Sequence, residues 1–225
     1  MQAPEIIITE DGSHSLKLRD VDEHYHSVYG AIAESRHVFI EAGLKIVLKA
    51  SPSQLNILEV GFGTGLNALL TLFAIRHTDV VIRYTALEPF PLDEKIWQAL
   101  NYPEFLDANE AAESFSGLHN SPWEQMHEIT TGFYIQKTRK GILDLSPAAP
   151  VFNLVYFDAF SPDVQPELWT EEIFELISKI TRPDAVLVTY SARGSVRRAM
   201  QKAGFAVERL PGPKGKREML RAIRL

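Results

Sequence analysis

The 225-residue sequence contains no cysteine. Disulfide bonds, thiolate zinc sites and thiol nucleophiles are therefore excluded, and nothing points to an oxidising compartment. No stretch approaches the ~20 consecutive apolar residues that cross a bilayer, and the first residues show no basic segment followed by an apolar one. We therefore expect a cytoplasmic protein with no membrane partner.

Internal repeats, low-complexity tracts and Gly/Ser-rich linkers are also missing, and the 13 prolines are scattered between periodic segments. A chain of this length buries one sizeable core rather than two. We therefore expect one compact unit with two parts. Residues 1–50 form a hairpin (residues 6–18) and a helix (residues 29–49) that cap the core. Residues 51–225 form the core domain.

The histidines do not form a cluster of metal ligands. His24 and His26 follow Glu23 closely, but no second group of ligand residues completes a site with them. We expect these histidines to be exposed or hydrogen-bonded, and we expect no metal cofactor.

Positive charge is scarce overall and unevenly distributed. The net charge is −6, yet from Arg193 onward ten Lys and Arg face only two Glu, which gives +8 there and −14 for the first 192 residues. The basic segment includes Arg193, Arg197, Arg198, Lys214, Lys216 and Arg217. This asymmetry predicts a basic face on an acidic body, which either contacts RNA phosphates or is only a solvated surface.

From Leu55 onward, short apolar runs alternate with helical stretches, which is typical of βα units that build a parallel sheet. Strands are predicted at residues 55–60, 80–87, 133–136, 154–157 and 185–189, and helices at residues 66–76, 93–100, 170–180 and 196–203. Two last strands, residues 206–209 and 218–223, follow each other without a helix and should form an antiparallel hairpin at one edge. The pattern predicts a doubly wound α/β fold with a mostly parallel sheet.

A glycine-rich turn follows the first core strand. Gly61, Gly63 and Gly65 come directly after an apolar run and lead into an apolar helix. Glycines let the backbone turn sharply and approach a ligand closely. The turn lacks the Lys and Ser/Thr of a P-loop, and Leu66 stands where a dinucleotide turn needs a small residue. Glu59, in front of the glycines, would repel a pyrophosphate, so NAD and ATP are disfavoured.

S-adenosylmethionine suits this turn better, because it carries an ammonium, a sulfonium and a carboxylate but no phosphate. Glu88 ends the next strand, 27 residues after Gly61. A carboxylate there can accept hydrogen bonds from ribose hydroxyls. The alternative is a glycine-rich loop beside an ordinary surface glutamate.

A second carboxylate, Asp158, ends a later strand, and Phe160 stands two residues further on. Ligands of open α/β sheets bind at the carboxyl ends of the strands, so Asp158 should face the same crevice as the glycine turn and Glu88. An alkylamine has a pKa of ~10 and is mostly protonated at neutral pH. A base that takes its proton and a ring that shields the path of the methyl group therefore suit N-methylation. The alternative is that Asp158 only caps a helix or closes a turn ahead of Pro162.

Four blocks of sequence resemble the methyltransferase domain of the MnmC family of bacterial tRNA-modification enzymes. The blocks are residues 25–27, 30–31 and 34–39; the glycine turn at residues 59–67; residues 157–162 and 166–170; and residues 189–191, 196–198, 203–205 and 216–219. The resemblance spans nearly the whole chain in the family's order. It implies S-adenosylmethionine-dependent methylation of 5-aminomethyl-2-thiouridine at the tRNA wobble position, giving 5-methylaminomethyl-2-thiouridine. It also implies that separate enzymes supply the aminomethyl precursor.

The resemblance assigns roles to individual residues. Asp158 matches the catalytic-site aspartate of the family, with Phe160 beside it. The implied cofactor-binding residues are Glu59, Gly61, Phe62, Gly63, Thr64, Gly65, Asn67 and Glu88. The implied substrate- or RNA-binding residues are His26, Ser27, Glu34, Arg193, Arg197, Arg198, Lys214, Lys216 and Arg217.

Two positions depart from the family pattern. Ala159 replaces a glycine of the two-domain enzymes, and the Gly-Asp pair expected after the third strand falls near Gln136 and Lys137, where no acid is available for the adenine. Two other functions stay open from the residues: methylation of a small-molecule amine, and a cofactor-binding scaffold without catalysis.

Overall fold

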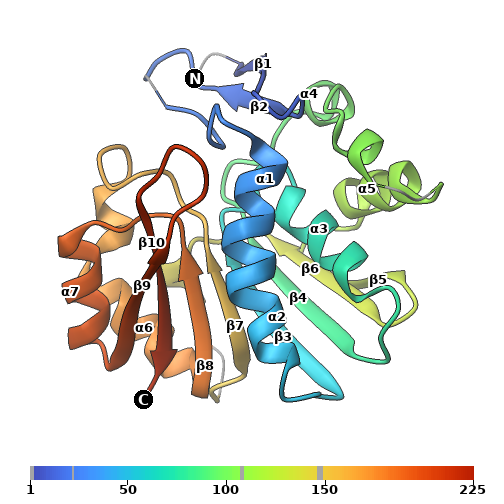
Figure 1. Ribbon diagram of the computed structural model, residues 1–225. Coiled ribbons are helices and arrows are strands. Elements are labelled where there is room, and N and C mark those ends of the chain that lie inside the picture. Colours follow the sequence, from blue (N-terminus) through green and yellow to red (C-terminus); the bar gives the residue numbers. More distant parts are fainter. Residues whose placement is uncertain (1–2, 22, 107–108, 146–148) are drawn as a thin grey trace.

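The computed structural model describes residues 3–21, 23–106, 109–145 and 149–225, which form a central β-sheet with helices on both faces (Figure 1). In these ranges the sheet has eight strands in the spatial order β5-β6-β4-β3-β7-β8-β10-β9. The strands are β3 (Gln54–Val60), β4 (Val81–Leu87), β5 (Met126–Thr130), β6 (Phe133–Thr138), β7 (Phe152–Phe157), β8 (Thr181–Thr189), β9 (Phe205–Pro211) and β10 (Glu218–Arg224).

The five central strands are parallel, because β3 pairs in parallel with β4 and β7, β4 with β6, and β7 with β8. At one side β10 runs antiparallel to β8 and β9, and at the other β5 runs antiparallel to β6. The predicted doubly wound, mostly parallel sheet with an antiparallel C-terminal hairpin is confirmed. Within this hairpin the last strand, β10, lies inside and β9 forms the edge.

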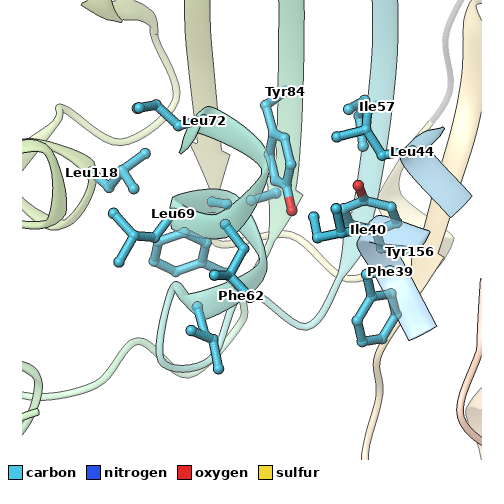
Figure 2. Close-up of a cluster of buried hydrophobic side chains, with 14 of the residues drawn as sticks. Phe39, Ile40, Leu44, Ile57, Phe62, Leu69, Leu72, Tyr84, Leu118 and Tyr156 are labelled. Atoms are coloured by element: carbon cyan, nitrogen blue, oxygen red, sulfur yellow. The ribbon is translucent and has the colours of Figure 1, made fainter. Parts of the chain in front are cut away.

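The central strands are apolar on both faces because helices cover both. Consecutive residues alternate between two hydrophobic clusters: Ile57 and Tyr156 belong to the first, Leu58 and Phe157 to the second. Figure 2 shows part of the first cluster, where side chains of the sheet meet those of α3 and of the N-terminal helix. There the ring of Phe39 lies 5.2 Å from that of Tyr156.

Each cluster has its own helices. Helices α3 (Leu66–Ile75), α4 (Glu94–Gln98) and α5 (Ala111–Asn120) contribute to the first cluster, and α6 (Glu171–Ile180) and α7 (Gly194–Lys202) to the second. Short 3-10 turns lie at η2 (Tyr102–Phe105), η3 (Ile142–Asp144) and η4 (Pro166–Trp169). The sequence did not predict α5 or β5. Helix α5 mixes serines, a glycine and a glutamate, and β5 is exposed along most of its length, so neither shows a clear apolar period.

The N-terminal segment consists of a hairpin and a helix, as predicted. Strands β1 (Glu5–Ile8) and β2 (His14–Lys17) pair antiparallel, and one continuous helix follows as α1 (Ala31–Ser35), η1 (Arg36–Leu44) and α2 (Lys45–Leu48). The middle part, η1, is a π-helix, which the sequence did not predict. The helix lies close against the sheet: a Cβ on Gly43 would lie 2.9 Å from Val188. It is thus a layer of the fold, in front of the sheet in Figure 1.

Candidate active site

Three neighbouring strands bring the predicted residues together. Strands β4, β3 and β7 lie side by side in parallel. Glu88, Gly61 and Asp158 each follow the carboxyl end of one of these strands, so they lie at the same end of the sheet. All three line one cavity of about 710 Å³. The segment after β2 and the start of α1 close the other side with residues that include Tyr25 and Glu34. The convergence predicted from the sequence is confirmed.

The glycine turn is shaped by its contact with the end of β7. Gly61 has φ +92°, and a Cβ there would lie 2.7 Å from the carbonyl oxygen of Asp158. Any side chain at this position would therefore be strained and would push the two loops apart. Phe62, Gly63 and Thr64 also line the cavity.

Gly65 lies outside the cavity wall. It precedes α3 with φ +74°, and a Cβ there would lie 2.9 Å from Nε2 of His119. The His119 ring stacks on Trp97 at 4.5 Å, and its Nε2 lies 3.0 Å from the Thr64 carbonyl oxygen. Burial lowers the pKa of His119 to about 3, so the neutral ring donates this hydrogen bond and braces the turn.

The Glu88 carboxylate accepts hydrogen bonds from the backbone of two segments that line the cavity. Its Oε2 accepts from the Gly63 N–H at 2.8 Å, and its Oε1 accepts from the Phe90 N–H at 2.9 Å. Burial raises the pKa of Glu88. The half-buried carboxyl still faces the cavity, and its remaining lone pairs are available to ribose hydroxyls.

Glu59 and Asn67 lie behind the cavity wall instead of lining it. Glu59 is fully buried and Asn67 is 3% exposed. The Asn67 Nδ2 donates to Oε1 of Glu59 at 3.0 Å and to Oδ2 of Asp158 at 2.8 Å. Burial, reinforced by the charge of Asp158, raises the pKa of Glu59 well above its ordinary value.

Asp158 is surrounded by protein on most sides and open to the cavity on the other. Burial, reinforced by the nearby Glu34, raises its pKa to about 7. The backbone after it is fixed on both sides, because the Tyr190 hydroxyl donates to the carbonyl of Ala159 and the Trp169 Nε1 donates to the carbonyl of Phe160, each at 2.9 Å. Asp158 is therefore a carboxyl group of near-neutral pKa on a segment held by hydrogen bonds.

Aromatic rings lie beside this carboxyl group. Phe160 lines the cavity, with its ring 5.0 Å from that of Tyr25 in an edge-on arrangement. Tyr25 also lies over Gly63, where a Cβ would come within 3.3 Å of its ring, and burial raises its pKa to about 12. Tyr190, directly after β8, completes this wall. A role for Tyr190 was not predicted from the sequence, although Tyr190 follows the end of a strand, as Asp158 does.

The N-terminal candidates form a hydrogen-bonded lining. His26 is 8% exposed, and burial lowers its pKa to about 4, so it is neutral at pH 7. The Ser27 N–H donates to Oε2 of Glu34 at 2.7 Å, and Oε1 of Glu34 pairs with Lys216. The Lys216 ammonium lies 4.0 Å from the centre of the Tyr190 ring. His26, Ser27, Glu34 and Lys216 all line the cavity.

The other basic candidates do not line the cavity. Exposed ion pairs hold Arg193 to Asp163 and Lys214 to Glu10. Arg197 points along α7 toward Gln201 at 3.4 Å, and the remaining two, Arg198 and Arg217, are exposed. Much of the basic C-terminal segment is therefore paired with the acidic body, which a count of charges cannot reveal.

The departure at Gln136 and Lys137 has a structural explanation. The Lys137 side chain points away from the cavity: its Nζ donates to the carbonyl of His119 and lies 4.8 Å from the centre of the Trp123 ring. Burial lowers its pKa to about 8. The cavity wall near the ends of β4 and β6 is formed instead by Pro89, Phe90, Gly141 and Ile142. This wall offers a purine apolar contact without a carboxylate.

Comparisons with known proteins agree with this geometry. Residues 113–224 match the sequence profile of a family described as S-adenosyl-L-methionine-dependent methyltransferase. Across 94% of its length, the chain is 33% identical to the bifunctional tRNA 5-methylaminomethyl-2-thiouridine biosynthesis protein MnmC of Azoarcus sp., and across 89% it is 32% identical to that of Campylobacter hominis. The crystal structure of MNMC2 from Aquifex aeolicus matches 99% of this chain and 70% of its own, with a TM-score of 0.83 and 28% identity. The chain is an S-adenosylmethionine-dependent methyltransferase that is similar to MnmC proteins.

This methyltransferase covers 34% and 30% of the two MnmC proteins, so it spans about a third of the length of the curated relatives it matches. A probable spermidine synthase from Corynebacterium glutamicum, 16% identical with a TM-score of 0.51 over 98% of this chain and 76% of its own, shares the fold alone. Across the described residues, no group of three His, Asp or Glu is placed to hold a metal ion, and no helix has the length and apolarity to cross a membrane.

Proposed function

We propose that this methyltransferase transfers the methyl group of S-adenosylmethionine to the exocyclic amine of 5-aminomethyl-2-thiouridine at the tRNA wobble position, giving 5-methylaminomethyl-2-thiouridine. The observation that carries the proposal is the position of Asp158. A carboxyl group with a pKa of about 7 shares one cavity with the glycine turn and with Glu88. The likeness to MnmC proteins supports this choice of substrate.

The residues at the glycine turn fit the cofactor. We assign the methionine part to the turn from Gly61 to Thr64, the ribose to Glu88, and the adenine to the apolar wall that includes Phe90 and Ile142. Glu88 suits the ribose, because its two oxygens each accept only one backbone hydrogen bond and retain free lone pairs. When bound there, the cofactor supplies an electrophilic methyl group on a sulfonium. Gly65, Glu59 and Asn67 support this site from behind.

Asp158 supplies the base that an amine needs. The substrate arrives mostly as an ammonium, which has no lone pair to attack a methyl group. Asp158 is half ionised near pH 7, so it can take one proton from the nitrogen. Phe160 and Tyr25 exclude water from the path between nitrogen and sulfonium. The secondary ammonium then leaves with its remaining protons, and Asp158 returns its proton to water in the cavity.

The RNA contacts fall into two groups. Lys216, Glu34, Ser27 and His26 line the cavity, and we assign them to the modified nucleoside. The basic residues outside the cavity are assigned to backbone phosphates: the exposed Arg193, Arg198, Lys214 and Arg217, and the partly buried Arg197. The enzyme would act in the cytoplasm, after separate enzymes have built the aminomethyl group.

Methylation of a small-molecule amine is the second candidate. It is favoured by one observation: Arg193 and Lys214 are held by Asp163 and Glu10, which leaves less free positive charge for phosphates than the sequence implies. Binding of bulk tRNA, strong at low salt and lost as salt rises, separates the two candidates.

The experiment that tests the proposal combines the purified protein, labelled S-adenosylmethionine and tRNA from cells that lack this modification. We expect the label in one nucleoside, 5-methylaminomethyl-2-thiouridine, and no label with Asp158→Ala, which should still bind the cofactor. Full activity of Asp158→Ala would contradict the mechanism. Absence of labelled nucleoside with the unaltered protein would contradict the choice of substrate.

A further inference from the structure

One side-chain amide joins two carboxyl groups behind the cavity wall. Asn67 lies in the first turn of α3, and its Nδ2 donates to Glu59 at 3.0 Å and to Asp158 at 2.8 Å. Both N–H groups of this amide are thus used on carboxyl oxygens. Among the buried atoms of the described residues, Oδ1 of Asn67 and Oε2 of Glu59 have no hydrogen-bond partner. The cluster is therefore built around the two bonds that Nδ2 donates.

Two ionised carboxyl groups on one amide would repel each other strongly in a buried setting. Burial and the charge of Asp158 both raise the pKa of Glu59, which favours its protonated form. Asp158, unlike Glu59, is open to the cavity, and its pKa is about 7. The amide of Asn67 stabilises the ionised form of Asp158, whereas the hydrogen bond to Glu59 holds the amide in place.

We propose that Asn67 is a positioning residue for methyl transfer: anchored by Glu59, it holds Oδ2 of Asp158 and leaves Oδ1 to face the amine in the cavity. This inference rests on the proposed N-methyltransferase function. It replaces the expectation that Glu59 and Asn67 bind the cofactor directly, because neither residue lines the cavity.

The reaction balances with this arrangement. Oδ1 of Asp158 accepts one proton from the substrate ammonium, which frees the nitrogen lone pair. The nitrogen–carbon bond forms as the carbon–sulfur bond breaks, and its electron pair stays on sulfur, which becomes a neutral thioether. A carboxylate with one oxygen fixed presents the other in one orientation, so the proton transfer needs no rearrangement.

Other groups also act on Asp158 and must be kept constant in a test. Glu34, from the N-terminal helix, raises its pKa, and Lys216, from the loop before β10, lowers it. Tyr190 after β8 also faces it. Replacing residue 67 removes the hydrogen bond from Asn67 to Asp158 and leaves these three side chains in the protein.

The test compares Asn67→Leu, which has a side chain of the same branched shape and no donor, with Thr71→Val. Thr71 lies one turn further along α3. Its hydroxyl donates a hydrogen bond to the backbone carbonyl oxygen of Asn67 and to neither carboxyl group. Asp158 is titrated by carboxyl ¹³C NMR, with its signal assigned from its absence in Asp158→Asn. We expect Asn67→Leu to raise the pKa of Asp158 by about one pH unit, because a hydrogen bond to the ionised form is lost. Thr71→Val should leave it unchanged.

The kinetic and binding measurements complete the test. For Asn67→Leu we expect a kcat at pH 7 that is at least tenfold lower. The acid limb of its pH profile should move to higher pH by the same amount as the NMR titration of Asp158. Its Kd for S-adenosylhomocysteine should stay within threefold of that of the unaltered protein. A Kd raised tenfold or more with an unchanged Asp158 titration would overturn the proposal, and so would an unchanged titration with unchanged kcat. If Asn67→Leu does not fold, Asn67→Ala is measured with the same criteria.

Two of these measurements need no RNA. The NMR titration and the binding of S-adenosylhomocysteine use the protein and the cofactor product alone. If the unaltered protein fails to methylate tRNA, the proposed function is wrong, while the effect of Asn67 on Asp158 is still decided by the titration.

Discussion

Replacement of Asp158 by asparagine tests the electrostatics of the site, because the variant keeps the shape of the side chain and removes its ionisation. In the folded protein burial raises the pKa of Asp158 from 3.8 to about 7. The folded state thus binds the proton more tightly than the unfolded state. Through this group, stability rises as pH falls from about 8 to about 4, which is opposite to the behaviour of a salt-bridged aspartate.

The magnitude follows from the two pKa values. From about pH 7 down to pH 5 Asp158 carries a proton in the folded protein but not in the unfolded chain. Over these two pH units, each unit changes the unfolding free energy by about 1.4 kcal/mol. Asparagine keeps the shape of Asp158 and does not ionise, so the stability of the variant does not depend on pH through this residue. The variant should therefore gain about 2–3 kcal/mol over the unaltered protein between pH 5 and pH 8, an upper value because water in the cavity screens the carboxylate.

Urea unfolding of both proteins at pH 5, 6, 7 and 8 measures this difference. The buried histidines His26 and His119, whose pKa values burial lowers to about 4 and 3, also make stability depend on pH. They are present in both proteins, so their effect cancels in the difference. A difference in unfolding free energy that does not change with pH would show that Asp158 has an ordinary pKa, and the reasoning about the base would fail.

Three further results are expected. The methylation rate of the unaltered protein should rise with pH through about 7, because the base must be ionised; a constant rate from pH 6 to 8 would contradict this. Gly61→Ala should lower the unfolding free energy by about 2–4 kcal/mol, because the new Cβ would lie 2.7 Å from the Asp158 carbonyl oxygen at a positive φ. The control Gly117→Ala should not destabilise the protein, because the nearest atom to its Cβ would be 3.7 Å away. Lys216→Met should lower the unfolding free energy by about 1–3 kcal/mol, because Glu34 is then buried without its cation. The double variant Lys216→Met, Glu34→Gln should regain most of this stability. If the single and double variants are equally stable, the loss does not come from the unpaired Glu34.

The fold and the position of the site were accessible from the sequence because strand ends obey a simple rule. An apolar run that ends in a charged or glycine residue identifies both a parallel strand and the residue at its functional end. Gly61, Glu88 and Asp158 each follow such a run, and the structure places all three on one cavity. No contact between distant residues had to be predicted for this result.

The parts that were missed depend on contacts between distant residues. Glu59 appears in the sequence as an acid beside the glycines, yet its side chain points behind the turn to Asn67, eight residues later. The basic segment appears free, yet Arg193 is paired with Asp163, thirty residues earlier. A one-dimensional pattern records which charges exist, but their partners follow from packing, which also decides whether a carboxyl group is ionised.

The closure of the cavity follows from contacts between the two ends of the chain. Glu34, at the start of the N-terminal helix, pairs with Lys216, which is 182 residues away, and Glu10 pairs with Lys214. The loop that carries both lysines lies directly against the N-terminal segment, because a Cβ on Gly215 would lie 2.1 Å from the ring of Tyr29. The N-terminal hairpin is a separate two-stranded sheet, which Asn101 also holds through Gly12, and the loop lies between β9 and β10. The contacts between the two ends therefore stabilise this closure, and a change at either end should alter the substrate side of the cavity before it alters the glycine turn.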